Sequence, residues 1–149
     1  MTINLTIRPY RAETDCAALS AIWLDASRGA HAFLGEARLL EQQTLIETRY
    51  LPLAETWVAE IAGQPAGFIS LLGSFIGGLF VAPAWQGRGV GRRLVAHALA
   101  LKGTLELDVY LQNDGAVAAY RAMGFREVNR MDTDAEGLPY PTARLRLES

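Results

Sequence analysis

Short stretches of this chain alternate hydrophobic and polar residues, the pattern of β-strands with one buried face. Ile3, Leu5 and Ile7 form the first such set, which Pro9 closes. Residues 74–81 are instead apolar on both faces, so they are expected to form a central strand. The pattern predicts seven strands, over residues 5–9, 56–61, 66–72, 74–81, 105–111, 127–132 and 142–147.

Other stretches place apolar residues three and four apart, which is typical of amphipathic helices. Thr14 or Asp15 is a candidate cap for the first helix, and residues 28–35 are expected to form a loop. The second helix is expected to end before Pro52, since a residue preceding proline avoids helical conformation. The pattern predicts four helices, over residues 15–27, 36–51, 89–103 and 114–123.

The resulting order, βααβββαβαββ, predicts an α/β (mixed α+β) fold. We expect a mixed, mostly antiparallel sheet with helices on both faces. Gly77 and Gly78 are costly inside the central strand, which indicates a β-bulge or a closely approaching ligand there.

Composition limits the kind of protein. With 149 residues, 50% of them hydrophobic, the chain is expected to form one domain, residues 1–149. A net charge of −2 without a basic block argues against a nucleic-acid partner. One cysteine and two histidines predict neither a disulfide nor a metal site, so a cytoplasmic location is expected.

An uncharged span between Glu60 and Arg88 is long enough to cross a membrane. Polar residues and glycines interrupt it, and Pro65 and Pro83 bound it. Two buried strands explain the span better than one helix does, so no membrane association is expected.

A glycine-spaced loop follows the central strand. Gly87, Gly89 and Gly91 allow backbone N–H groups to approach a ligand closely, and the first N–H groups of the next helix point to the same place. Arg88, Arg92 and Arg93 add positive charge that pairs well with phosphate oxygens. The loop therefore predicts a phosphate site.

Two other phosphate motifs fit less well. The Walker A motif needs a Gly-Lys-Ser/Thr ending, and the chain's single lysine, Lys102, lies too far along. The dinucleotide motif G-x-G-x-x-G would need a glycine where Arg92 stands, although Asp108 follows at a suitable spacing. A nicotinamide oxidoreductase is therefore the weaker alternative.

The loop Gln-Gly-Arg-Gly-Val-Gly, residues 86–91, resembles the Q/R-x-x-G-x-G/A acetyl-CoA loop of the GNAT superfamily of N-acetyltransferases. Residues 113–125 are similar to that family's N-x-x-A-x-x-x-Y-x-x-x-G-F segment, with Asn113 and Tyr120 about two helical turns apart. Three further segments are similar to the YjaB-like group of small bacterial acetyltransferases, and they extend the resemblance to nearly the whole chain. They are residues 21–23, 31–34 and 137–141.

The resemblance implies transfer of an acetyl group from acetyl-CoA to a primary amine, directly and within a ternary complex. The amine can be a small molecule, a protein lysine or an N-terminus. No metal is implied. Backbone groups of residues 79–81 are expected to hold the pantetheine arm and polarise the thioester carbonyl. The residues expected to contact acetyl-CoA are Leu79, Phe80, Val81, Gln86, Gly87, Arg88, Gly89, Val90, Gly91, Arg92 and Asn113.

Tyr120 is the expected catalytic residue. A phenol, with a pKa near 10, stays protonated at neutral pH and can give its proton to a departing thiolate, whose pKa is near 8.5. The alternative is a tyrosine that only packs a short helix.

Acceptor contacts are less defined. His31, Phe33, Glu60 and Tyr110 are the candidates for binding the amine. Glu60, Glu106, Asp108 or water could serve as the base. A non-catalytic acyl-CoA-binding module that acts as a sensor or partner is the alternative function, and the sequence leaves monomer and homodimer both open.

Overall fold

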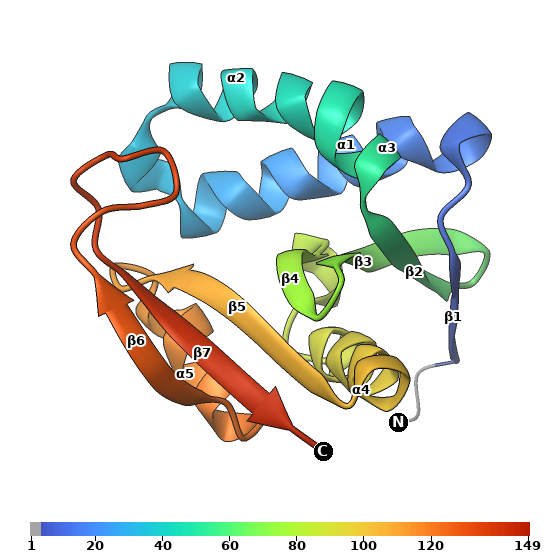
Figure 1. The fold of residues 1–149 in the computed structure, drawn as a ribbon. Coiled ribbons are helices and arrows are strands. Elements are labelled where there is room, and N and C mark those ends of the chain that lie inside the picture. Colours follow the sequence, from blue (N-terminus) through green and yellow to red (C-terminus); the bar gives the residue numbers. More distant parts are fainter. Residues whose placement is uncertain (1–3) are drawn as a thin grey trace.

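A sheet of seven strands organises the structure, a computed structural model that describes residues 4–149. The strand order is β1-β2-β3-β4-β5-β7-β6, and every neighbouring pair is antiparallel except β4 and β5 (Figure 1). All predicted strands are confirmed close to their expected ends, while Ile3 lies outside the described residues. The strands are β1 (Leu5–Pro9), β2 (Glu55–Ile61), β3 (Gln64–Leu72), β4 (Phe75–Val81), β5 (Thr104–Tyr110), β6 (Arg126–Met131) and β7 (Thr142–Glu148).

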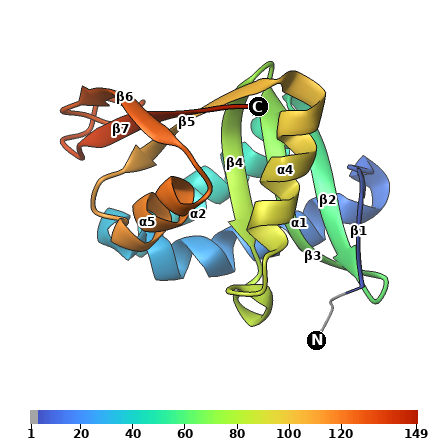
Figure 2. The same ribbon diagram turned by 90° about the horizontal axis from the view of Figure 1, so that it is seen from below.

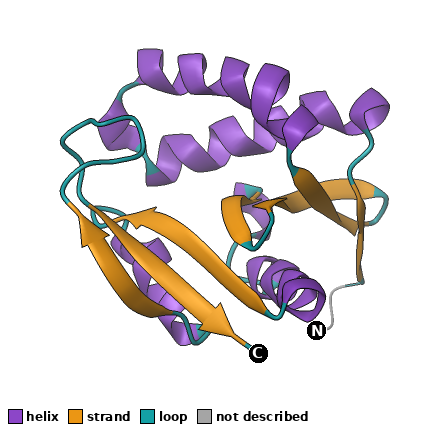
Figure 3. Ribbon diagram, in the orientation of Figure 1, coloured by secondary structure: helices purple, strands orange, loops and turns teal. Residues whose placement is uncertain are grey.

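Helices cover both faces of the sheet, which confirms the predicted fold class. α1 and α2 lie over one face, and α4 and α5 lie against the other (Figures 1 and 2; helices and strands are distinguished in Figure 3). Within residues 4–149, no helix combines the length and the apolar content needed to cross a bilayer. The α-helices are α1 (Ala12–Ala30), α2 (Glu36–Leu45), α3 (Leu51–Leu53), α4 (Val90–Lys102) and α5 (Asp114–Ala122).

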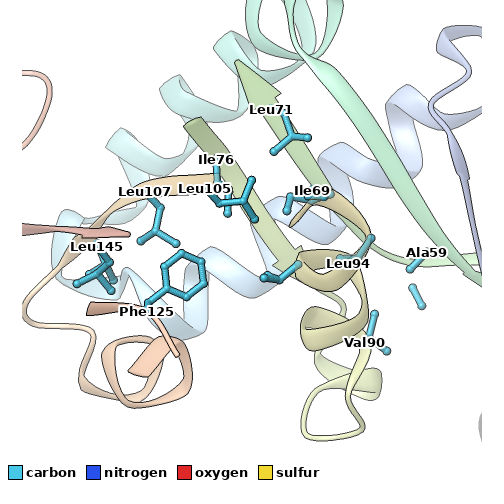
Figure 4. Close-up of a cluster of buried hydrophobic side chains, with 14 of the residues drawn as sticks. Ala59, Ile69, Leu71, Ile76, Val90, Leu94, Leu105, Leu107, Phe125 and Leu145 are labelled. Atoms are coloured by element: carbon cyan, nitrogen blue, oxygen red, sulfur yellow. The ribbon is translucent and has the colours of Figure 1, made fainter. Parts of the chain in front are cut away.

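The sheet separates two hydrophobic clusters. The larger one lies toward α4 and α5 and includes Ile69, Leu94 and Phe125 (Figure 4). The second lies toward α1 and α2 and includes Leu19 and Phe68. Because neighbouring residues of β3 point into different clusters, this strand is buried on both faces, as its apolar sequence predicts.

β4 is the central strand, and it carries the predicted bulge. Ser70 pairs with Gly78 while Leu71 pairs with Ile76, so Gly77 has no partner on β3. The extra residue bends the strand and alters its twist.

The first helix is longer than the sequence predicts. α1 begins after Arg11, without a side-chain cap, and runs to Ala30. Asp15 is therefore not its cap: its buried carboxylate accepts the backbone N–H of Arg11 and pairs with Arg8 of β1. The prediction of a loop over residues 28–35 is also wrong. α1 includes residues 28–30, and a 3-10 turn (Ala32–Leu34) follows it almost at once.

The predicted helix end before Pro52 is also wrong. α2 continues through a π-helical segment (Ile46–Tyr50) into α3, whose second residue is Pro52. A proline ring crowds the carbonyl four residues before it, and a π-helical turn is wider than an α-helical one. The wider turn lets the chain pass Pro52 without stopping.

Candidate active site

A cavity of about 530 Å³ lies where β4 and β5 separate. The two strands pair only through Phe75 with Glu106 and Ile76 with Leu107, and beyond these pairs they diverge (Figure 2). The end of α1 and one side of α5 complete the walls. The parallel strands thus create a cleft at the centre of the sheet, where open α/β sheets commonly bind ligands.

Backbone groups along one edge of β4 face this cavity. The N–H of Ala82 donates to the carbonyl of Ala66 on β3 at 2.8 Å. The backbone N–H groups of Phe80 and Gly78, two and four residues earlier, therefore also point toward β3. Since successive residues of a strand alternate in direction, the N–H groups of Leu79 and Val81 point toward the cavity. Such fixed donors suit a carbonyl or amide group of a ligand.

Phe80 alternates with these residues. Its ring packs against Trp23 and Phe68, with ring centroids 6.2 Å and 5.6 Å away, and the residue also lines the cavity. Its packing holds β4 against the helix on that face.

The loop after β4 turns at two glycines in the left-handed region. Gly87 has a φ of +74°, and Gly89, which precedes α4, has a φ of +84°. The side-chain amide of Gln86 donates to the carbonyl of Val81 at 3.0 Å and fixes the loop to the end of β4. The first N–H groups of α4 lie at this end of the cavity, where the helix dipole favours an anion.

Val90 and Gly91 begin α4 in different ways. Val90 is buried in the core and anchors the helix. Gly91 lines the cavity without a positive φ, and an added Cβ would meet Val81 Cγ2 at an ordinary 3.7 Å. Gly91 therefore leaves space at the cavity wall. The left-handed backbone conformations of the loop are those of Gly87 and Gly89.

Two arginines stand beside the loop. Arg88 and Arg92 are exposed, and neither makes an ion pair with a residue in the described range 4–149. The Arg88 guanidinium lies over the Trp85 ring, 5.3 Å from its centroid. Both side chains are available to phosphate oxygens. Arg93, the third arginine expected there, instead donates to the Leu5 carbonyl of β1 at 3.3 Å.

α5 carries the second motif into the cavity. Asn113 caps the helix, as predicted, because its Oδ1 accepts the Ala116 N–H at 3.2 Å. Tyr120 lines the cavity two turns later and packs edge-on against Phe125, with centroids 5.5 Å apart. Burial raises the pKa of the Tyr120 phenol to about 12, so it holds its proton at neutral pH.

A cluster of four aromatic side chains lies at the α1 end of the cavity. His31 and Tyr110 line the cavity directly, with ring centroids 5.2 Å apart. Phe33 packs edge-on against the Tyr110 ring at 5.2 Å, and Tyr140 packs against Phe33 at 5.3 Å. Burial lowers the pKa of His31, which favours its neutral form.

The three carboxylates proposed as bases are each held by an arginine. Glu60 does not line the cavity: it lies on β2, and Arg8 of β1 binds its carboxylate. Glu106 pairs with Arg146 at 3.2 Å. Asp108 does line the cavity, but Arg144 binds both its oxygens.

Sequence reasoning missed two residues of the aromatic end. Asp134 is buried, and its Oδ2 accepts the Tyr110 hydroxyl at 3.0 Å. Burial, and then this hydrogen bond, raise the pKa of Tyr110 above its usual range. Tyr140 lies in the segment Gly-Leu-Pro-Tyr-Pro, whose resemblance to the YjaB-like group was the available signal for it.

The profile of the acetyltransferase (GNAT) domain matches residues 52–127 of this chain. The peptidyl-lysine N-acetyltransferase YjaB of Salmonella typhimurium is 39% identical over 128 residues, which cover 85% of this chain and 88% of YjaB. The chain belongs to the GNAT acetyltransferase family. The solution structure of YjaB from Escherichia coli matches with a TM-score of 0.87 and 37% identity, covering 98% of this chain and 97% of that one. The PaiA N-acetyltransferase of Thermoplasma acidophilum, solved with coenzyme A, shares the fold with a TM-score of 0.81 at 16% identity, covering 99% of this chain and 100% of that one.

As a GNAT acetyltransferase, the protein is an acetyl-CoA-dependent N-acetyltransferase. Acetyl-CoA supplies an acetyl group activated as a thioester. The cavity fits such a ligand, because it joins backbone donors on β4, a helix N-terminus with a glycine loop, and unpaired arginines beside the loop. Among residues 4–149, no three His, Cys, Asp or Glu side chains cluster closely enough to hold a metal ion.

Replacing Gly89 tests the loop of this GNAT site. A leucine there is strained at a φ of +84° and distorts the N–H groups at the start of α4. We expect Gly89→Leu to weaken acetyl-CoA binding at least tenfold, about 1.4 kcal/mol, by calorimetry. Gly103→Leu is the matched control, since Gly103 ends the same helix with a φ of +79° and open space around it. Equal affinity loss in both variants would show that strain alone, and not the loop, is responsible.

Proposed function

We propose that this enzyme acetylates the ε-amino group of lysine in proteins or peptides, by direct transfer within a ternary complex in the cytoplasm. The observation that carries the proposal is the similarity to YjaB, a peptidyl-lysine N-acetyltransferase, over 85% of this chain. The chain's single cysteine, which excludes an internal disulfide, is consistent with the location.

The shape of the cavity supports a lysine acceptor. A lysine side chain has an apolar stem of four carbons and a polar head. The aromatic cluster of His31, Phe33, Tyr110 and Tyr140 offers apolar contacts for the stem where it approaches the cavity. Tyr120 lies at the opposite wall, on α5. A side chain entering past the aromatic cluster therefore leads its amine toward β4 and Tyr120.

The chemistry needs three contributions from the protein. An alkylammonium with a pKa near 10.4 must lose a proton, at a cost of about 4 kcal/mol near pH 7.4. The N–H groups of Leu79 and Val81 are placed to stabilise negative charge that develops on the carbonyl oxygen. Tyr120 keeps its proton at neutral pH and can donate it to the leaving sulfur.

A panel of acceptors tests the proposal. Release of CoA would be followed with peptides that contain one internal lysine and a blocked N-terminus, and mass spectrometry would locate the acetyl group. The matched control peptide carries arginine in place of lysine. Exclusive acetylation of small amines or free N-termini would overturn the lysine assignment.

Binding of CoA should stabilise the fold. A ligand at 100 times its Kd adds about 2.7 kcal/mol to the free energy of unfolding. For a chain of this size we expect the Tm to rise by about 5 to 10 °C, in a concentration-dependent way. Thermal melts in CoA and in NAD make the comparison, and an equal rise with NAD would contradict the assignment of the loop to CoA.

A further inference from the structure

Four titratable side chains line the cavity within the described part of the chain. They are His31, Asp108, Tyr110 and Tyr120. The reaction in the proposed function needs one of them, or water, to take a proton from the acceptor ammonium before nitrogen can attack. The surroundings of each group decide whether it can accept a proton.

Asp108 and the two tyrosines are poorly suited to this step. Arg144 donates to both oxygens of Asp108, at 2.9 Å and 3.1 Å, so both oxygens of this carboxylate are already engaged. The Tyr110 hydroxyl already donates its proton to Asp134. Tyr120 holds its proton, which is the state a proton donor requires.

His31 has the opposite character. It follows α1 directly, and its backbone N–H donates to the Ser27 carbonyl at 2.7 Å, so its position at the cavity wall is fixed. Tyr110 of β5 and Phe33 of the following turn pack edge-on against the imidazole. These apolar edges disfavour the charged ring, so His31 is neutral at pH 7 and has a free lone pair.

The charged groups nearest this end lie behind Tyr110 and not against the imidazole. Asp134 binds the Tyr110 hydroxyl, and Arg38 of α2 reaches the same loop through an ion pair with Glu136 at 2.5 Å. Arg38 offsets one of these two negative charges, and none of the three groups is a cause of the lowered His31 pKa. Burial is thus what sets the protonation of His31.

We propose that His31 is the catalytic base that removes the proton from the acceptor amine. The inference rests on the proposed function in that it requires an amine acceptor, but it holds for lysine and for any other primary amine. It assigns removal of the ammonium proton to His31, at the end of α1, and protonation of the leaving sulfur to Tyr120, on α5, at opposite walls of the cavity.

The reaction exchanges one carbon–sulfur bond for one carbon–nitrogen bond. An imidazole nitrogen of His31 takes one proton from the ammonium and later releases it to solvent. The amine nitrogen then forms a bond to the acetyl carbon, and the carbon–sulfur bond breaks with its electron pair on sulfur. Tyr120 protonates the sulfur, and its phenolate regains a proton from the nitrogen of the new amide. The net products are the amide, the thiol and one proton.

His31→Gln is the primary test, with His97→Gln as the matched control. His97 is the chain's other histidine, and it lies on α4 against Trp57, away from the cavity. At pH 7 and with both substrates saturating, we expect kcat to fall by about 10²- to 10⁴-fold for His31→Gln and to stay within about twofold for His97→Gln. The Kd of acetyl-CoA should change little in either variant.

The pH profile separates a base from a structural residue. The wild-type kcat should be level from pH 7 to 9 and fall only at acid pH, because the lowered pKa of His31 delays its protonation. In His31→Gln, kcat should rise about tenfold per pH unit, since only the small neutral fraction of the amine reacts. A constant ratio between wild type and variant over this range would overturn the proposal, as would an unchanged kcat at pH 7.

Nuclear magnetic resonance gives a readout independent of turnover. With two histidines in the chain, the His31→Gln variant identifies the His31 imidazole signals by their loss. We expect those signals to titrate below the ordinary histidine value of about 6.5, and to match the acid limb of wild-type kcat. A titration above that value would contradict the neutral base.

Failure of the proposed function gives a different result. If lysine peptides are not acetylated but another amine is, the lysine assignment fails and the same pH profiles, measured with that amine, still decide the role of His31. If no amine accepts the acetyl group, both proposals are wrong.

Discussion

Tyr120→Phe is expected to lower the rate of acetyl transfer by about 10²- to 10⁴-fold, the usual contribution of a general acid. The substitution keeps the ring that packs against Phe125 and removes only the hydroxyl of this cavity-lining residue. Acetyl-CoA affinity should therefore barely change. Single-turnover rates with saturating acetyl-CoA are the appropriate measurement, because slow product release could hide the chemical step.

The pH dependence of this variant distinguishes proton donation from positioning. Burial raises the Tyr120 pKa to about 12, so the wild-type phenol remains a donor throughout the working range. Above the thiol pKa of about 8.5, the thiolate leaves more readily without a proton, and the gap between wild type and variant should narrow. A gap that stays constant with pH would assign Tyr120 a positioning role. Tyr50→Phe, at an exposed site in the π-helical segment, is the control and should behave as wild type.

Asp15→Ala is expected to cost about 3 to 5 kcal/mol of unfolding free energy, as removal of one partner of a buried ion pair typically does. The Asp15 carboxylate is 2% exposed and accepts two hydrogen bonds from Arg8, at 2.7 Å and 2.9 Å. It also accepts the Arg11 N–H at 2.8 Å, so one side chain joins β1 to the start of α1. Without it, the Arg8 guanidinium keeps only its contacts with Glu60 and with the Pro9 carbonyl.

Urea unfolding at several pH values measures this contribution. The Arg8 hydrogen bonds lower the Asp15 pKa below its ordinary value of 3.8, while burial opposes the shift. The stabilisation is therefore complete above about pH 4 and is lost as the pH falls through the lower native pKa, so wild type and variant should converge in acid. Glu36→Ala is the matched control, because the Arg28–Glu36 pair has both partners about half exposed and contributes little. A similar loss in both variants would show that burial of Asp15 is unimportant.

Much of the site was predictable because its residues are close in sequence. The turn at Gly87 and Gly89, the start of α4 and the Asn113 cap depend on local backbone chemistry, and each is confirmed. The bulge at Gly77 is local in the same sense. The spacing of Asn113 and Tyr120 fixes both on one side of a short helix, and both line the cavity.

The sequence by itself therefore determined the order of the strands and helices, the glycine loop and the face of α5 that carries Tyr120. Only the tertiary structure decided where β4 and β5 separate, which carboxylates are held by arginines, and which rings surround His31. These features join residues far apart in the chain, such as His31 with Tyr110 and Glu60 with Arg8. A local pattern records whether a side chain is apolar, charged or helix-forming, but the partner that sets its protonation or its burial is chosen by the packing of distant segments.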